Sequence, residues 1–81
     1  MTINYSEEHS MDAYENLANA IILQAVKDYR HALKLLARNS KCTSALSTKA
    51  ECERFFRSER FQMLTSVDGE MLIQKLKAEV T

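Results

Sequence analysis

The chain has 81 residues, of which 46% are apolar and 27% are charged, and its formal net charge is zero. Such a composition excludes a disordered chain and is typical of a small globular protein with a single domain. A chain this short buries only about 60% of the surface that its unfolded form exposes, so we expect it to gain stability from a homo-oligomer or a larger partner.

The chain begins with a polar, acidic stretch over residues 1–11 that shows no helical period. We interpret it as a flexible acidic leader. The first helix is predicted to start at Asp12, because Glu15 follows it at the spacing of a capping box. It should cover residues 12–38, where neither Gly nor Pro occurs, and stop at Asn39-Ser40.

One side of this long predicted helix carries apolar residues at intervals of three and four. The stripe is wide, so it needs either two packing helices or one helix and a second subunit to cover it. We therefore take its apolar residues as a candidate protein interface. They are Leu17, Ile21, Ile22, Val26, Tyr29 and Leu33.

The opposite side of the second half of this helix is basic, with Lys27, Arg30, Lys34 and Arg38. Cations near the C-terminal end of a helix complement its macrodipole, and a solvated face carries charge in any case. The same stripe could instead meet phosphates or an acidic protein. Both interpretations stay open.

A second helix is predicted over residues 44–57, capped by Thr43 or Ser44, with a short helical turn over 59–64 that begins after Ser58. Phe55 and Phe56 should anchor this segment in the core. Three further basic residues recur beside the Phe residues at every third position. They are Arg54, Arg57 and Arg60. Interleaved Arg and Phe residues can bind single-stranded nucleic acid, or the Arg residues can pair with nearby Glu residues at helical spacing.

The last helix is predicted over residues 67–79, with Asp68 as a cap and an apolar stripe that contains Ile73 and Leu76. The only glycine, Gly69, suggests a special backbone angle in the preceding turn. A DNA-reading helix-turn-helix over 61–80 matches weakly, because Lys75 stands where that motif needs a buried apolar residue.

No catalytic, metal or cofactor motif is recognisable. His9 and His31 are far apart in sequence, and Cys42 and Cys52 do not have the spacing of a zinc site. On one helix the two cysteines would lie about 15 Å apart, so we expect free thiols and a cytoplasmic location. We expect no small-molecule substrate and, since the longest apolar run is only Ala20 to Leu23, no membrane span.

Two segments carry a resemblance to a known family. YENLANAIILQAVKDYRHAL and ECERFFRSERFQMLTSVDGEMLIQKLKAEV resemble a short family of uncharacterised proteins encoded on bacteriophages and integrative conjugative elements of gut Firmicutes. Trp is common in that family where this chain has Arg60. The resemblance implies an accessory protein of a mobile element in a bacterial cytoplasm, and it implies no enzymatic activity.

Together these patterns predict an all-α, three-helix domain over residues 12–81 with a long first helix, and an intertwined oligomer or one formed through the first helix stays open. We expect a non-enzymatic accessory or regulatory protein that contacts another protein chain or forms a homo-oligomer. The alternative is a nucleic-acid-binding protein that uses the basic residues named above. The distribution of charge along the chain agrees with protein binding and with nucleic-acid binding, because residues 16–60 carry an excess of Lys and Arg while both ends are acidic.

Overall fold

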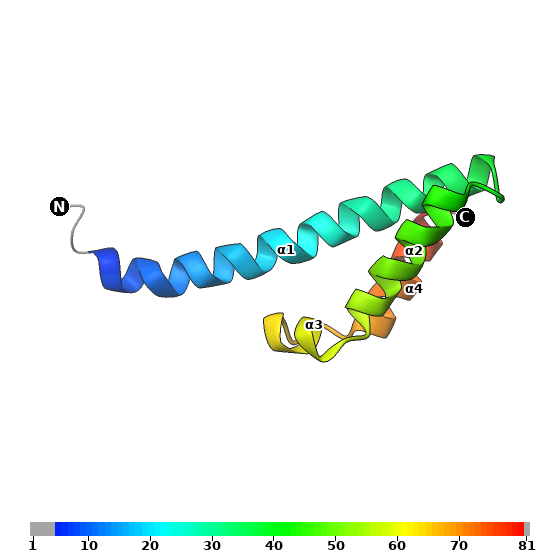
Figure 1. Ribbon diagram of the computed structural model, residues 1–81. Coiled ribbons are helices and arrows are strands. Elements are labelled where there is room, and N and C mark those ends of the chain that lie inside the picture. Colours follow the sequence, from blue (N-terminus) through cyan, green and yellow to red (C-terminus); the bar gives the residue numbers. More distant parts are fainter. Residues whose placement is uncertain (1–4, 81) are drawn as a thin grey trace.

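The computed structural model describes the backbone of residues 5–80 and the side chains of residues 15–80. This part of the chain is all-α, as predicted, and contains four helices and no strand. They are α1 (Tyr5–Arg38), α2 (Thr43–Phe56), α3 (Glu59–Leu64) and α4 (Gly69–Val80). Figure 1 shows that α1 runs the length of the molecule, while α2 and α4 pack along its C-terminal part. The overall dimensions of 54 × 22 × 19 Å therefore reflect the length of α1.

The first helix begins earlier than predicted. It starts at Tyr5 and not at Asp12, so Asp12 lies within the helix and cannot be its N-cap. Residues 5–11, predicted as part of a flexible leader, are helical, and residues 1–4 lie outside the described part. This stretch has neither Pro nor Gly and includes Glu7 and Glu8, which are good helix formers, so nothing local stops the helix at residue 12.

The connection between α1 and α2 has the predicted position but a different cap. The long helix ends at Arg38, as expected, and Asn39 closes the turn by accepting backbone hydrogen bonds from Cys42 (3.1 Å, carbonyl) and Lys41 (3.0 Å, side chain). The prediction of Thr43 or Ser44 as the cap of α2 is wrong. Cys42 is the N-cap, because the Asn39 turn lets the helix start at Thr43, and the Cys42 side chain accepts no capping hydrogen bond.

The two later caps are confirmed. Ser58 Oγ accepts a hydrogen bond from the Phe61 backbone N–H (3.2 Å) at the start of α3. Asp68 Oδ1 accepts from the backbone N–H groups of Glu70 (2.9 Å) and Met71 (3.3 Å) at the start of α4. These bonds satisfy N–H groups that have no partner within their own helix.

Gly69 does not have the special backbone angle that we expected. Its φ is not positive, and it is the first residue of α4. The reason for glycine is steric, because a Cβ at this position would overlap the carbonyl oxygen of Phe56 and approach the Phe61 ring at 3.5 Å. The turn therefore brings the start of α4 directly against the end of α2, where no side chain fits.

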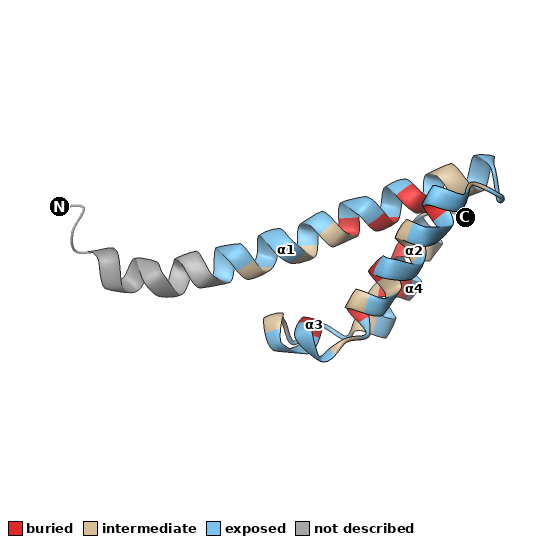
Figure 2. Cartoon of the chain, viewed as in Figure 1, coloured by how far each residue is buried: buried red, intermediate tan, exposed pale blue. Residues whose placement is uncertain are grey.

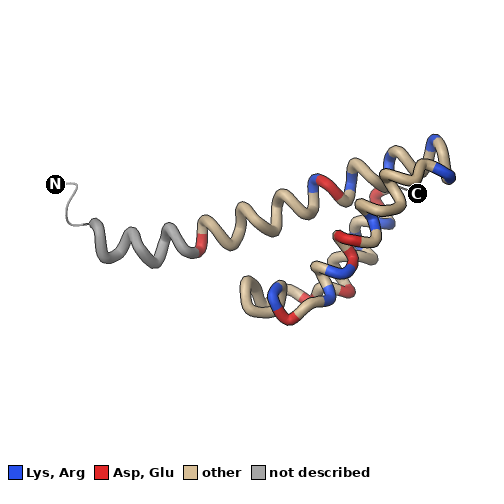
Figure 3. Tube along the Cα trace, viewed as in Figure 1, with Lys and Arg blue, Asp and Glu red and all other residues tan. Residues whose placement is uncertain are grey.

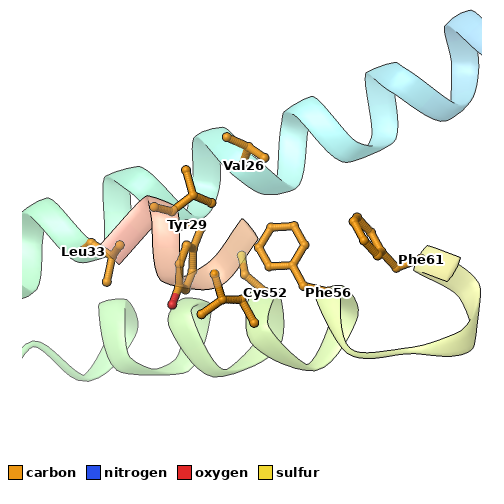
Figure 4. Packing of buried hydrophobic residues seen from close by; sticks show 8 residues of the cluster. Val26, Tyr29, Leu33, Cys52, Phe56 and Phe61 are labelled. Carbon is orange, nitrogen blue, oxygen red and sulfur yellow. The ribbon is translucent and has the colours of Figure 1, made fainter. Parts of the chain in front are cut away.

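The core lies where α2, α3 and α4 meet the second half of α1 (Figures 2 and 4). Tyr29 is fully buried at its centre, and its ring meets the Phe56 ring edge-on with a centroid distance of 5.7 Å. Phe61 lies at one end of the core, and its ring centroid is 5.6 Å from those of both Phe55 and Phe56. The cluster of buried residues comprises Val26, Tyr29, Leu33, Cys52, Phe56, Phe61, Ile73 and Leu76.

Candidate protein-interaction surface

Residues 16–25 of α1, which we call the arm, extend away from the core. None of their side chains is buried, and Val26 is the first buried residue among the described side chains of α1. Three large apolar side chains of the arm face solvent. Leu17 is 57% exposed, Ile21 is 41% exposed and Leu23 is 59% exposed. Figure 2 shows the arm as exposed or intermediate, in contrast to the buried positions nearer the C-terminus of α1.

The arm is also uncharged. From Asn16 to Val26 there is no Lys, Arg, Asp or Glu, and Figure 3 shows this stretch of the Cα trace in continuous tan. An exposed helix is normally kept soluble by charged side chains around its free faces. An exposed, uncharged helical segment that carries two leucines and an isoleucine is therefore a candidate contact surface.

A groove of about 520 Å³ lies beside the arm, between α1, α2 and α3. Its apolar lining comes mainly from small residues of α1 together with Ile21, Cys52 and Phe55. Charged and polar side chains complete the lining, among them Arg60, which is exposed. The full set is Ala20, Ile21, Gln24, Ala25, Asp28, Glu51, Cys52, Phe55 and Arg60.

The structure divides the six residues predicted as a protein interface into three groups. Val26, Tyr29 and Leu33 are buried in the chain's own core, so their prediction as an intermolecular interface is wrong. The reason is that α2 and α4 together cover this half of the stripe. Ile22 packs against the edge of the core, and only Leu17 and Ile21 remain exposed.

The Cys52 thiol contributes to the groove but is not set up as a nucleophile. It is buried, and its Sγ donates a weak hydrogen bond to the carbonyl oxygen of Ala25 (3.6 Å). Burial, together with the nearby carboxylates of Asp28 and Glu51, raises the pKa of the Cys52 thiol. The group therefore stays protonated at neutral pH and serves as a small apolar side chain.

Glu53 connects three helices on the side of α2 that faces α1 and α4. Its Oε2 accepts a hydrogen bond of 2.6 Å from the Tyr29 hydroxyl and lies 2.9 Å from Lys49 Nζ and 3.9 Å from Lys77 Nζ. Partial burial alone would raise the pKa of this carboxyl, but the hydrogen bonds from Tyr29 and Lys49 lower it. Burial and the same carboxylate raise the pKa of Tyr29, so its hydroxyl remains a donor.

Two of the predicted basic contacts are already neutralised by acidic residues of α4. Arg30 forms a bidentate pair with Glu79 through bonds of 2.8 and 3.0 Å. Arg57 forms a similar pair with Glu70 at 2.9 and 3.1 Å, and it also lies 3.8 Å from Glu53. The hydrogen bonds from these arginines lower the pKa values of Glu79 and Glu70.

The other five predicted basic residues are exposed and form no ion pair within the described part of the chain. They are Lys27, Lys34, Arg38, Arg54 and Arg60. Three of them belong to α1, and the remaining two belong to α2 and α3. Pairing of Arg57 with Glu53 follows the helical spacing that the sequence indicates, whereas the pairs with Glu70 and Glu79 join different helices.

The described side chains include no group of three or more His, Cys, Asp or Glu residues that could hold a metal ion. His31 is exposed on α1, and Cys42 lies at the start of α2. The Ser44 hydroxyl, 3.6 Å from Cys42 Sγ, together with backbone N–H groups at this helix start, lowers the pKa of the Cys42 thiol. No hydrogen-bonded histidine or carboxylate accompanies this thiol among the described residues, so no nucleophile–base pair is formed there.

Sequence reasoning missed the groove and the exposure of Leu23. Leu23 is not among the stripe residues named above, although it is apolar and 59% exposed. The lack of charge from Asn16 to Val26 is a signal in the sequence that could have identified the arm. The groove has no such signal, because its lining comes from three separate helices.

Comparisons with protein-family models, with curated proteins and with solved structures find no match for this chain. Within the described residues, no helix combines the length and apolar character that a membrane span requires.

Proposed function

We propose that this chain is a non-enzymatic accessory or regulatory protein that works by binding a protein chain through the arm and the adjoining groove. The sequence resemblance described above supports an origin in a bacterial mobile element and a cytoplasmic location. The two free cysteines agree with a reducing compartment.

The observation that carries this proposal is the exposed and uncharged arm. Leu17, Ile21 and Leu23 leave a substantial apolar area in water on a segment without a single charged residue. Burying such an area contributes about 25 cal/mol per Å² of apolar surface. A partner that covers it therefore gains binding free energy from this contact. The groove extends the same surface onto Phe55 of α2.

In-cell photo-crosslinking tests this proposal. A photoreactive phenylalanine analogue replaces Leu17 on the arm in one variant and Leu46 of α2, which is exposed but lies outside the groove, in the control. We expect irradiation to join the Leu17 variant to a polypeptide that mass spectrometry identifies, with no adduct from the Leu46 variant. No polypeptide adduct at position 17 would reject the proposal.

The ion pairs weaken the alternative of nucleic-acid binding. Arg30 and Arg57 are held by Glu79 and Glu70, and the remaining candidates are distributed over three helices. A phosphate-binding surface would show affinity for DNA or RNA that falls steeply with salt and with Lys34→Glu. We expect no binding of duplex or single-stranded DNA at low salt, and a mobility shift that disappears with Lys34→Glu would favour the alternative.

A further inference from the structure

We propose that the protein chain bound by the arm is a second copy of this protein, and that two copies pair their α1 helices antiparallel about Ile21. In this dimer the arm of each copy lies against the groove of the other. The inference rests on the proposed function and names the partner of the same surface.

Charge order along α1 favours the antiparallel arrangement. Residues 1–15 hold four acidic and no basic residues. The part of α1 after Val26 carries four Lys or Arg residues against one acid, Asp28, and of these four only Arg30 is paired with α4. The uncharged stretch from Asn16 to Val26 lies between them, and its midpoint is Ile21. Two antiparallel copies centred there bring the acidic end of each helix to the level of the basic part of the other, whereas parallel copies would align like charges.

The same register brings an apolar side chain to each groove. In an antiparallel pair centred on Ile21, the level of Leu17 in one copy coincides with that of Ala25 in the other. Ala25 lines the groove together with Cys52 and Phe55, and the small alanine leaves space for a larger side chain. Leu17 and Ile21 lie on the same side of the arm, one helical turn apart, so both can face the partner at once.

Two-fold symmetry makes this interface self-complementary. Each copy supplies one Leu17–Ile21 face and one groove, so one closed dimer covers both and leaves neither for further growth. The absence of charge between Asn16 and Val26 also means that two identical arms meet without repulsion between like charges. A second α1, packed antiparallel, would therefore cover the Leu17 and Ile21 side of the arm, which α2 and α4 leave exposed.

Light scattering after size exclusion gives the first test, on the full chain. We expect a particle with twice the 9.3 kDa mass of one chain, and we expect Leu17→Glu to halve that mass. Leu23→Glu is the matched control, because Leu23 lies on the same arm with nearly equal exposure, 59% against 57%, but on a different side of the helix from Leu17 and Ile21. Circular dichroism confirms that both variants stay helical. A monomeric wild type, or equal dissociation by both variants, would overturn the proposal.

Disulfide trapping tests the direction of pairing in a chain where Cys42 is replaced by Ser and Cys52 by Ala. Ile21→Cys should crosslink to itself, because the two copies of this residue face each other at the symmetry axis. Leu17→Cys should not crosslink alone but should form a disulfide when mixed with Ala25→Cys. Efficient self-crosslinking of Leu17→Cys would show parallel helices and would overturn the proposal.

The two proposals can fail separately. A monomeric wild type that still crosslinks through position 17 to a different polypeptide in the cell would reject the dimer and keep the proposed function. A monomer that crosslinks to no polypeptide would reject both.

Discussion

Replacing Tyr29 by Phe removes one hydroxyl group from the centre of the fold and leaves the rest of the side chain in place. Tyr29 is fully buried, and its hydroxyl donates a 2.6 Å hydrogen bond to the Glu53 carboxylate. The ring keeps its edge-on contact with Phe56 in the variant, because that contact does not involve the oxygen. The substitution therefore isolates the contribution of a single hydrogen bond between α1 and α2.

A hydrogen bond to a charged group contributes about 1.5–3 kcal/mol to stability. We expect the lower end, because Glu53 keeps Lys49 at 2.9 Å and its side chain is 15% exposed, so water can replace the lost donor. A loss of about 1.5 kcal/mol lowers Tm by roughly 6–12 °C in a domain of this size. It is also a large part of the total stability expected for so short a chain.

Urea unfolding followed by circular dichroism measures this effect on wild type, Tyr29→Phe, Glu53→Gln and the double variant. All four are compared at one protein concentration, because association would add to the apparent stability. The double-mutant cycle should show coupling between Tyr29 and Glu53 of about 0.5 kcal/mol or more. If Tyr29→Phe changes stability by less than about 0.5 kcal/mol, or if the two substitutions are additive, the Tyr29–Glu53 hydrogen bond does not stabilise the fold as proposed.

Three further outcomes are expected. Gly69→Ala should destabilise the fold by more than a typical surface substitution does, because the added Cβ collides with the Phe56 carbonyl. A variant that unfolds at the same urea concentration as wild type would contradict this. Phe61→Ala should lower the free energy of unfolding by about 3–5 kcal/mol and lower Tm sharply. Met63→Ala is the control in the same helix, and since Met63 is 85% exposed, Tm should not change. Equal effects of the two substitutions would exclude the core role of Phe61. Since the pKa of Glu53 is lowered in the folded state, its contribution is present above the unfolded value of about 4.3 and is lost as pH falls through the folded value. Wild type should thus lose more stability than Glu53→Gln between pH 7 and this acidic range, and parallel pH profiles would argue against the contribution.

Local sequence patterns predicted the helices and most of their ends. The absence of Gly and Pro allowed one long helix, and Ser58 and Asp68 begin the two later helices by hydrogen bonds that span only two or three residues. These features depend on neighbours in sequence, so they can be recognised without the fold. The start of α1 was missed because a capping-box pattern at Asp12 also fits inside a continuing helix.

Only the tertiary structure decided how the apolar stripe of α1 is used. The sequence shows Leu17 and Leu33 on one continuous stripe, but α2 and α4 cover Leu33 and leave Leu17 in water. Gly69 and the Arg30–Glu79 pair are similar cases, because the atoms that explain them lie far away in the chain. Helical periodicity determines which residues share a face, whereas the length of the helices packed against that face determines how much of it remains for a partner.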